Sequence, residues 1–110
     1  MSKSQRTKGA AGEREVCHII RDSLGIEAHR NLSQTREGGT DINLPPYRIE
    51  VKRRRRIAGL YDWLSQAENA CKPGERPMLV VRADGQGWLA ITPLTHQLAL
   101  IREEIVEAQK

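Results

Sequence analysis

Apolar residues between positions 9 and 24 recur at helical spacing and place Val16, Cys17, Ile20 and Leu24 on one face. Polar and charged residues fill the opposite face, and the glycine that follows is a suitable helix end. Glu13 belongs to the apolar face and should therefore point toward the surface on which the helix packs. Since burying an unpaired charge is costly, a carboxylate there requires a partner.

The rest of the chain alternates short extended segments with two further helical ones. Extended segments are expected over residues 26–32, 40–44, 49–52, 78–83 and 88–91, and helices over 59–71 and after Pro93. In the last helix one face carries Leu94, Leu98, Ile101, Ile105 and Ala108. The order α-β-β-β-α-β-β-α predicts an α/β fold with a mixed sheet flanked by helices. We expect one domain over residues 9–110, preceded by a flexible basic arm at 1–8.

The segment Ile49-Glu50-Val51-Lys52 combines strand character with reactive side chains. Alternation along a strand places Glu50 and Lys52 on one face and the two apolar residues on the other. If Leu44 pairs with Tyr47 in a hairpin, Asp41 lies opposite Glu50, roughly 5 Å away. Two carboxylates at that separation repel unless a cation binds them, so the hairpin predicts a metal site. The two prolines between the strands are stiff, and a one-residue slip of the register would reverse the faces.

Composition and charge indicate that the protein binds a polyanion. The 110-residue chain has a net charge of +4 and a pI near 9.4, with an unbroken basic run from Lys52 to Arg56 beside the predicted site. The two cysteines lie far apart and form no zinc or disulfide pattern. No apolar run is long enough for a membrane span or a signal peptide, so we expect a cytoplasmic protein with no membrane partner.

Together these motifs resemble the PD-(D/E)XK nucleases. The resemblance rests on Lys8-Gly9 and Glu13-Arg14-Glu15, on Gly39-Thr40-Asp41, on Ile49-Glu50-Val51-Lys52, and on Gln66-Ala67 in the following helix. It covers roughly residues 8 to 90. The chain looks most like the small Holliday junction resolvases and like compact phage-type nucleases. A threonine stands where the superfamily name has proline, at a position that varies.

The resemblance implies a restriction-endonuclease-like fold and a role for each matching residue. Asp41, Glu50 and the carbonyl of Val51 would bind Mg²⁺, with Mn²⁺ as an alternative, and Glu13 would approach the same ion. Lys52 would orient or activate the attacking water, and Gln66 would brace the site. Ser33 lies where these resolvases often carry a functional serine. The residues expected to contact nucleic acid are Lys8, Arg14, Arg30, Ser33, Arg36, Arg53, Arg54, Arg55 and Arg56.

The predicted function is that of a metal-dependent DNA endonuclease acting on branched or four-way junction DNA, as in phage DNA recombination. Cutting a junction on two strands needs two sites and therefore a homodimer. One alternative is another structure-specific or nicking nuclease of the superfamily. A second is a catalytically silent nucleic-acid-binding protein, in which Asp41, Glu50 and Lys52 form only a surface salt-bridge ladder.

Overall fold

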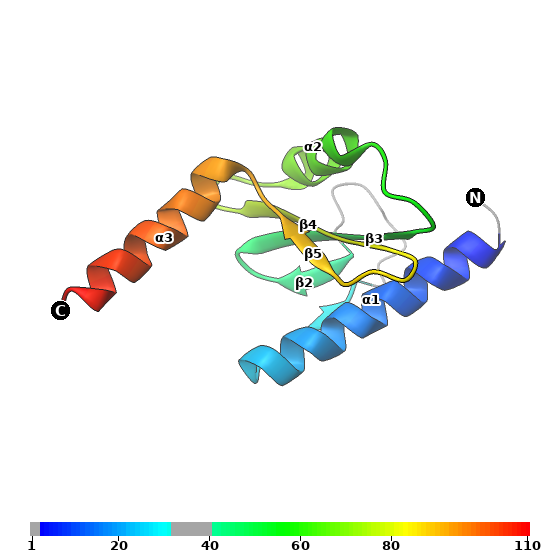
Figure 1. Cartoon of the computed structure of the whole chain (residues 1–110), viewed down its shortest axis with the longest axis horizontal. Helices are drawn as coiled ribbons and strands as arrows, with labels where there is room; N and C mark the ends of the chain where they lie inside the picture. The colour runs from blue at the N-terminus through cyan, green and yellow to red at the C-terminus, as the bar shows by residue number, and fades with distance from the viewer. Residues whose placement is uncertain (1–2, 32–40) are drawn as a thin grey trace.

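The patterns above give a five-stranded sheet with helices on both sides. The structure, a computed structural model, describes residues 3–31 and 41–110, and the side chains of 9–31 and 41–110. In chain order the elements are α1 (Lys3–Leu24), β1 (His29–Arg30), β2 (Ile42–Leu44), β3 (Tyr47–Arg54), α2 (Leu60–Ala70), β4 (Arg76–Ala83), β5 (Leu89–Ile91) and α3 (Leu94–Ala108). The predicted α/β fold and its element order are confirmed (Figure 1).

The sheet has the strand order β1-β2-β3-β4-β5 and is mixed. Strands β2 and β3 form an antiparallel hairpin in which Leu44 pairs with Tyr47, as predicted from the sequence. The crossover through α2 makes β4 parallel to β3, and β5 returns antiparallel to β4. Strand β3 lies in the middle of the sheet, and its side chains alternate between the two faces.

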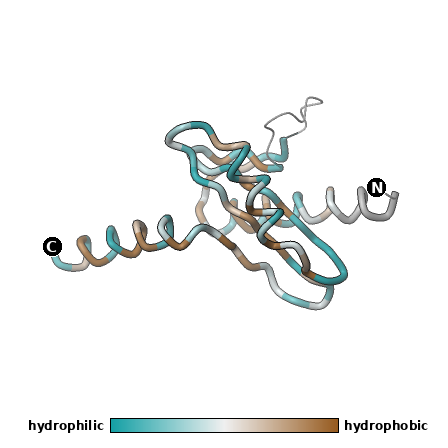
Figure 2. The backbone as a smooth tube through the Cα atoms, turned by 90° about the horizontal axis from the view of Figure 1, so that it is seen from above, coloured by the Kyte–Doolittle hydropathy of each residue, from teal (hydrophilic) through white to brown (hydrophobic). Residues whose placement is uncertain are grey.

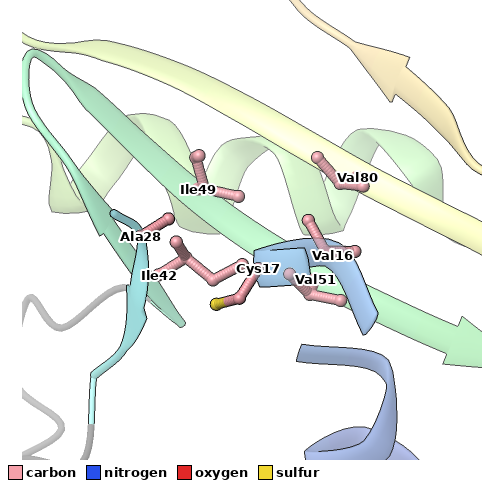
Figure 3. Close-up of a cluster of buried hydrophobic side chains, with 7 residues drawn as sticks. All are labelled: Val16, Cys17, Ala28, Ile42, Ile49, Val51 and Val80. Carbon is pink, nitrogen blue, oxygen red and sulfur yellow. The ribbon is translucent and has the colours of Figure 1, made fainter. Parts of the chain in front are cut away.

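Each face of the sheet is covered by one helix. Helix α1 packs on one face, where Val16 and Cys17 meet strand residues in a buried cluster completed by Ala28, Ile42, Ile49, Val51 and Val80 (Figure 3). Helix α2 lies on the opposite face of the sheet (Figure 1). There Ala67 is fully buried, and so are Leu79 and Val81 of β4. A small residue in the helix permits close approach to the strands.

Two boundaries differ from the sequence prediction. Helix α1 begins at Lys3, whereas its predicted start was about residue 9. Residues 3–8 are rich in Lys, Arg and Gln, which are good helix formers and continue the helix without needing an apolar stripe. Within the described residues, the first strand is His29–Arg30, shorter than the predicted 26–32, because its ladder with β2 consists of the pairs His29–Asn43 and Arg30–Ile42.

Helix α1 is also anchored through its polar side. One oxygen of Glu15 accepts hydrogen bonds from Trp88 Nε1 at 2.9 Å and from an Arg82 guanidinium nitrogen at 2.8 Å. Gly12 is buried beside this cluster, and a Cβ there would lie 3.3 Å from both Arg53 Cβ and the Trp88 ring. The absence of a side chain at Gly12 therefore lets α1 approach β3 closely. The sequence pattern had placed Glu15 on the solvent face and gave no sign of this anchor.

Candidate active site

Asp41 and Glu50 are brought together at the start of the β2–β3 hairpin. The Asp41 backbone is held on both sides, because its N–H donates to the Ile49 carbonyl at 3.0 Å and its carbonyl accepts from the Asn31 N–H at 2.8 Å. Its Oδ2 accepts a hydrogen bond of 2.7 Å from the Val51 backbone N–H. The ladder ends at the pair Ile42–Ile49, and a side-chain hydrogen bond joins Asp41 to Glu50 just beyond it. The predicted juxtaposition of the two carboxylates is thus present.

The electrostatics of this pair are unfavourable in the absence of a cation. The pKa of Glu50 rises from its ordinary value of 4.5 to about 7. Burial is the largest cause, followed by the negative charge of Asp41, while Lys52 acts in the opposite direction. A hydrogen bond with Asp41 and the charge of Glu13 raise it further. Two partly buried acids in contact, of which Glu50 has a raised pKa, form a site that a divalent cation would stabilise.

Lys52 lies on the same face of β3 as Glu50. The alternation is visible in the burial pattern, since Ile49 and Val51 are buried under α1 while Glu50 and Lys52 are partly exposed. The ammonium of Lys52 is 6.0 Å from the centroid of the Trp63 ring in α2. The Arg54 guanidinium, two residues further along the strand, is 5.7 Å from the same ring. Trp63 thus lies within cation–π range of two cations of β3, one of which, Lys52, also acts on Glu50.

Glu13 approaches from the α1 side. Its carboxylate is only 16% exposed and forms an ion pair of 2.9 Å with Arg30 of β1, so the predicted inward-facing acid does have a partner. It is near enough to raise the pKa of Glu50. However, the described residues contain no group of three or more His, Cys, Asp or Glu side chains placed to hold one metal ion. The structure therefore joins Asp41 with Glu50, and keeps Glu13 beside them in contact with Arg30.

The remaining predicted residues are dispersed around this centre. Gln66 is exposed on α2, and Arg14 is exposed on α1. The basic run divides by strand alternation, because Arg53 packs against α1 whereas Arg54 lies over Trp63. Arg55 and Arg56 follow β3 and are exposed. Three predicted contacts lie outside the described residues or side chains, namely Lys8, Ser33 and Arg36.

The donor set suits a hard divalent cation. Asp41 and Glu50 offer carboxylate oxygens, the ligands that Mg²⁺ and Mn²⁺ prefer, and Mg²⁺ usually needs only one or two of them because it retains several waters. The raised pKa of Glu50 is the physical sign of this fit, because a cation between the two acids would remove their repulsion.

No helix in the described part of the chain is long and apolar enough to cross a membrane.

The mixed α/β fold and the placement of Asp41, Glu50 and Lys52 are consistent with a nuclease of the PD-(D/E)XK type. The sequence model of the family described as "Phage putative PDDEXK endonuclease" matches residues 4–108, almost the whole chain. The chain belongs to this phage PD-(D/E)XK endonuclease family. No curated protein and no solved structure matches it.

Proposed function

We propose that the protein is a Mg²⁺-dependent endodeoxyribonuclease that hydrolyses phosphodiester bonds in branched or four-way junction DNA. The observation that carries the proposal is the partly buried Asp41–Glu50 pair, in which Glu50 shares one face of β3 with Lys52. A salt-bridge ladder alone would not need a second carboxylate beside the first. The small Holliday junction resolvases are the branch of the superfamily that we favour, and a homodimer would supply the two cuts.

Asp41, Glu50 and the carbonyl of Val51 would hold the ion, with Mn²⁺ as an alternative to Mg²⁺. The bound ion supplies a positive charge that polarises a phosphoryl oxygen and acidifies water. Lys52 would orient the attacking water and offset negative charge on the phosphate, with its ammonium 6.0 Å from the centroid of the Trp63 ring. Glu13 would act beside the ion while it is held by Arg30, and Gln66 would brace the site from α2.

The substrate class is tested by cleavage of matched linear, flapped and four-way DNA with Mg²⁺, with Mn²⁺ and with chelator. We expect metal-dependent cutting that is fastest on the four-way substrate. Faster cutting of a flap or a nicked duplex would assign the protein to another structure-specific branch. Binding of DNA and of divalent metal without any cleavage would identify a catalytically silent binding protein.

The exposed end of the basic run should carry DNA affinity. Replacing Arg55 and Arg56 with alanine is expected to flatten the dependence of log affinity on log salt by up to about two units, because each phosphate contact contributes a slope of about 0.9 on duplex DNA. Filter binding or fluorescence anisotropy over a salt series measures the slope. A matched control replaces Lys72 and Lys110, two exposed cations elsewhere on the chain, and should leave it unchanged. An unaltered slope in the arginine variant would show that Arg55 and Arg56 are only solvated.

A further inference from the structure

Helix α3 carries an apolar seam of coiled-coil type. Its apolar residues are separated by alternating steps of four and three, a spacing shared by Leu94, Leu98, Ile101, Ile105 and Ala108. This is the repeat with which two helices pack side by side, each apolar residue entering a space between residues of the facing helix. Figure 2 shows apolar and polar stretches alternating along α3.

The seam is not used within the chain. Leu94 is 70% exposed, Leu98 50%, Ile101 37% and Ile105 53%, and no residue of α3 is buried. The half-buried residues of the helix are on its other side, at His96, Ala99 and Leu100. The helix projects from the body of the molecule (Figures 1 and 2). In accordance with this shape, the radius of gyration is 14.7 Å, whereas about 13 Å is typical of a compact domain of this length.

An isolated α3 would be a poor helix. A 15-residue segment is marginal in water without a packed apolar face, and Ile101, Ile105 and Val106 are β-branched. Its charges also oppose its dipole. Glu103, Glu104 and Glu107 lie toward the C-terminal end, where negative charge is unfavourable, and the first turn has no acid. Both defects are corrected by one arrangement, an antiparallel neighbour whose positive N-terminal end lies beside the acidic turns.

We propose that the partner of α3 is α3 of a second copy of the chain, packed antiparallel through this seam. The steps of the repeat then place Leu98 against the partner's Ile101 and Leu94 against the partner's Ile105. Flanking residues are compatible, because Arg102 comes beside the partner's Thr95 and Glu104 beside the partner's Gln97, with no like charges opposed. A parallel pair would instead gather both acidic ends. The interface is independent of metal binding and cleavage.

The first test is the mass in solution over a concentration series, by sedimentation or by chromatography with light scattering, without metal or DNA. The wild-type chain should move from 12.4 kDa toward twice that mass as concentration rises. Ile101→Glu should raise the dissociation constant at least about tenfold. The matched control Val106→Glu alters an apolar residue of the same helix, 52% exposed but off the seam, and should change it less than about twofold. A wild-type monomer at all concentrations, or a dimer unaffected by Ile101→Glu, would overturn the proposal.

The second test is of orientation, by disulfide formation in a Cys71→Ser background, where the other cysteine, Cys17, is buried. A mixture of Leu94→Cys and Ile105→Cys chains should cross-link, whereas neither variant alone should do so, because in the antiparallel pair each of these residues lies eleven residues, about 16 Å along the axis, from its own copy. Cross-linking of each variant with itself would mean a parallel pair and would contradict the antiparallel interface. Circular dichroism of each variant shows whether the fold is retained. Neither test measures DNA cleavage. The dimer can therefore be confirmed even if the protein does not cleave DNA.

Discussion

Glu50→Gln and Asp41→Asn are each expected to abolish DNA cleavage, with a loss on the order of 10³-fold or more, while leaving DNA binding intact or tighter. A catalytic metal contributes several kcal/mol of transition-state stabilisation, and each 1.36 kcal/mol corresponds to about a tenfold change in rate. Removing either carboxylate charge removes half of the pair that would hold the ion. It also removes a negative charge beside the DNA phosphate. Single-turnover cleavage and equilibrium DNA binding measure the two effects separately.

Three further variants sharpen this prediction. Lys52→Ala should lose cleavage but retain metal affinity, because the lysine is not a ligand. Glu13→Gln should weaken Mg²⁺-dependent cleavage without reducing the stability of the metal-free protein by more than about 1.5–3 kcal/mol, the worth of a hydrogen bond to a charged group. The control Asp62→Asn alters an exposed carboxylate of α2 and should leave the rate of DNA cleavage unchanged. If the Asp41, Glu50 and Lys52 variants all cut as fast as wild type, the proposed active site is wrong.

The metal-free protein should become less stable as the pH rises from about 4.5 to about 7. In this window folded Glu50, with its pKa near 7, retains a proton that the unfolded chain has already released. The folded state therefore binds more protons than the unfolded state, so the free energy of unfolding falls with increasing pH. Because Glu50 is partly solvated, we expect a loss of about 1 to 3 kcal/mol.

Urea denaturation at pH 5 and pH 7.5 in the presence of chelator measures this loss. Glu50→Gln should reduce the difference between the two pH values, since glutamine does not titrate. Mg²⁺ should stabilise the wild-type protein more at pH 7.5 than at pH 5, because protons compete with the ion for the same oxygens. Equal stability of the metal-free wild type at both pH values would mean that burial and the neighbouring Asp41 do not raise the pKa of Glu50.

The hairpin and its carboxylate pair could be predicted from sequence because they depend on local rules. Once Leu44 pairs with Tyr47, alternation alone fixes which side chains share a face. The anchor of α1 could not be predicted in this way, since Glu15, Arg82 and Trp88 are far apart in sequence and meet only after the sheet has formed. Helix α3 shows a further limit. Periodicity identified its apolar face but contained no information on whether the same chain would cover it.

The hydrogen bond from the Val51 N–H to Asp41 Oδ2 couples the carboxylate pair to the edge of the sheet. Strand β2 is only three residues long and is followed at the edge by the two residues of β1, so this border has few backbone bonds to hold it closed. When the border opens, Asp41 leaves Glu50 and the Val51 amide loses its acceptor in the same event. The exchange rate of this single backbone proton therefore measures the fraction of molecules in which the pair is assembled.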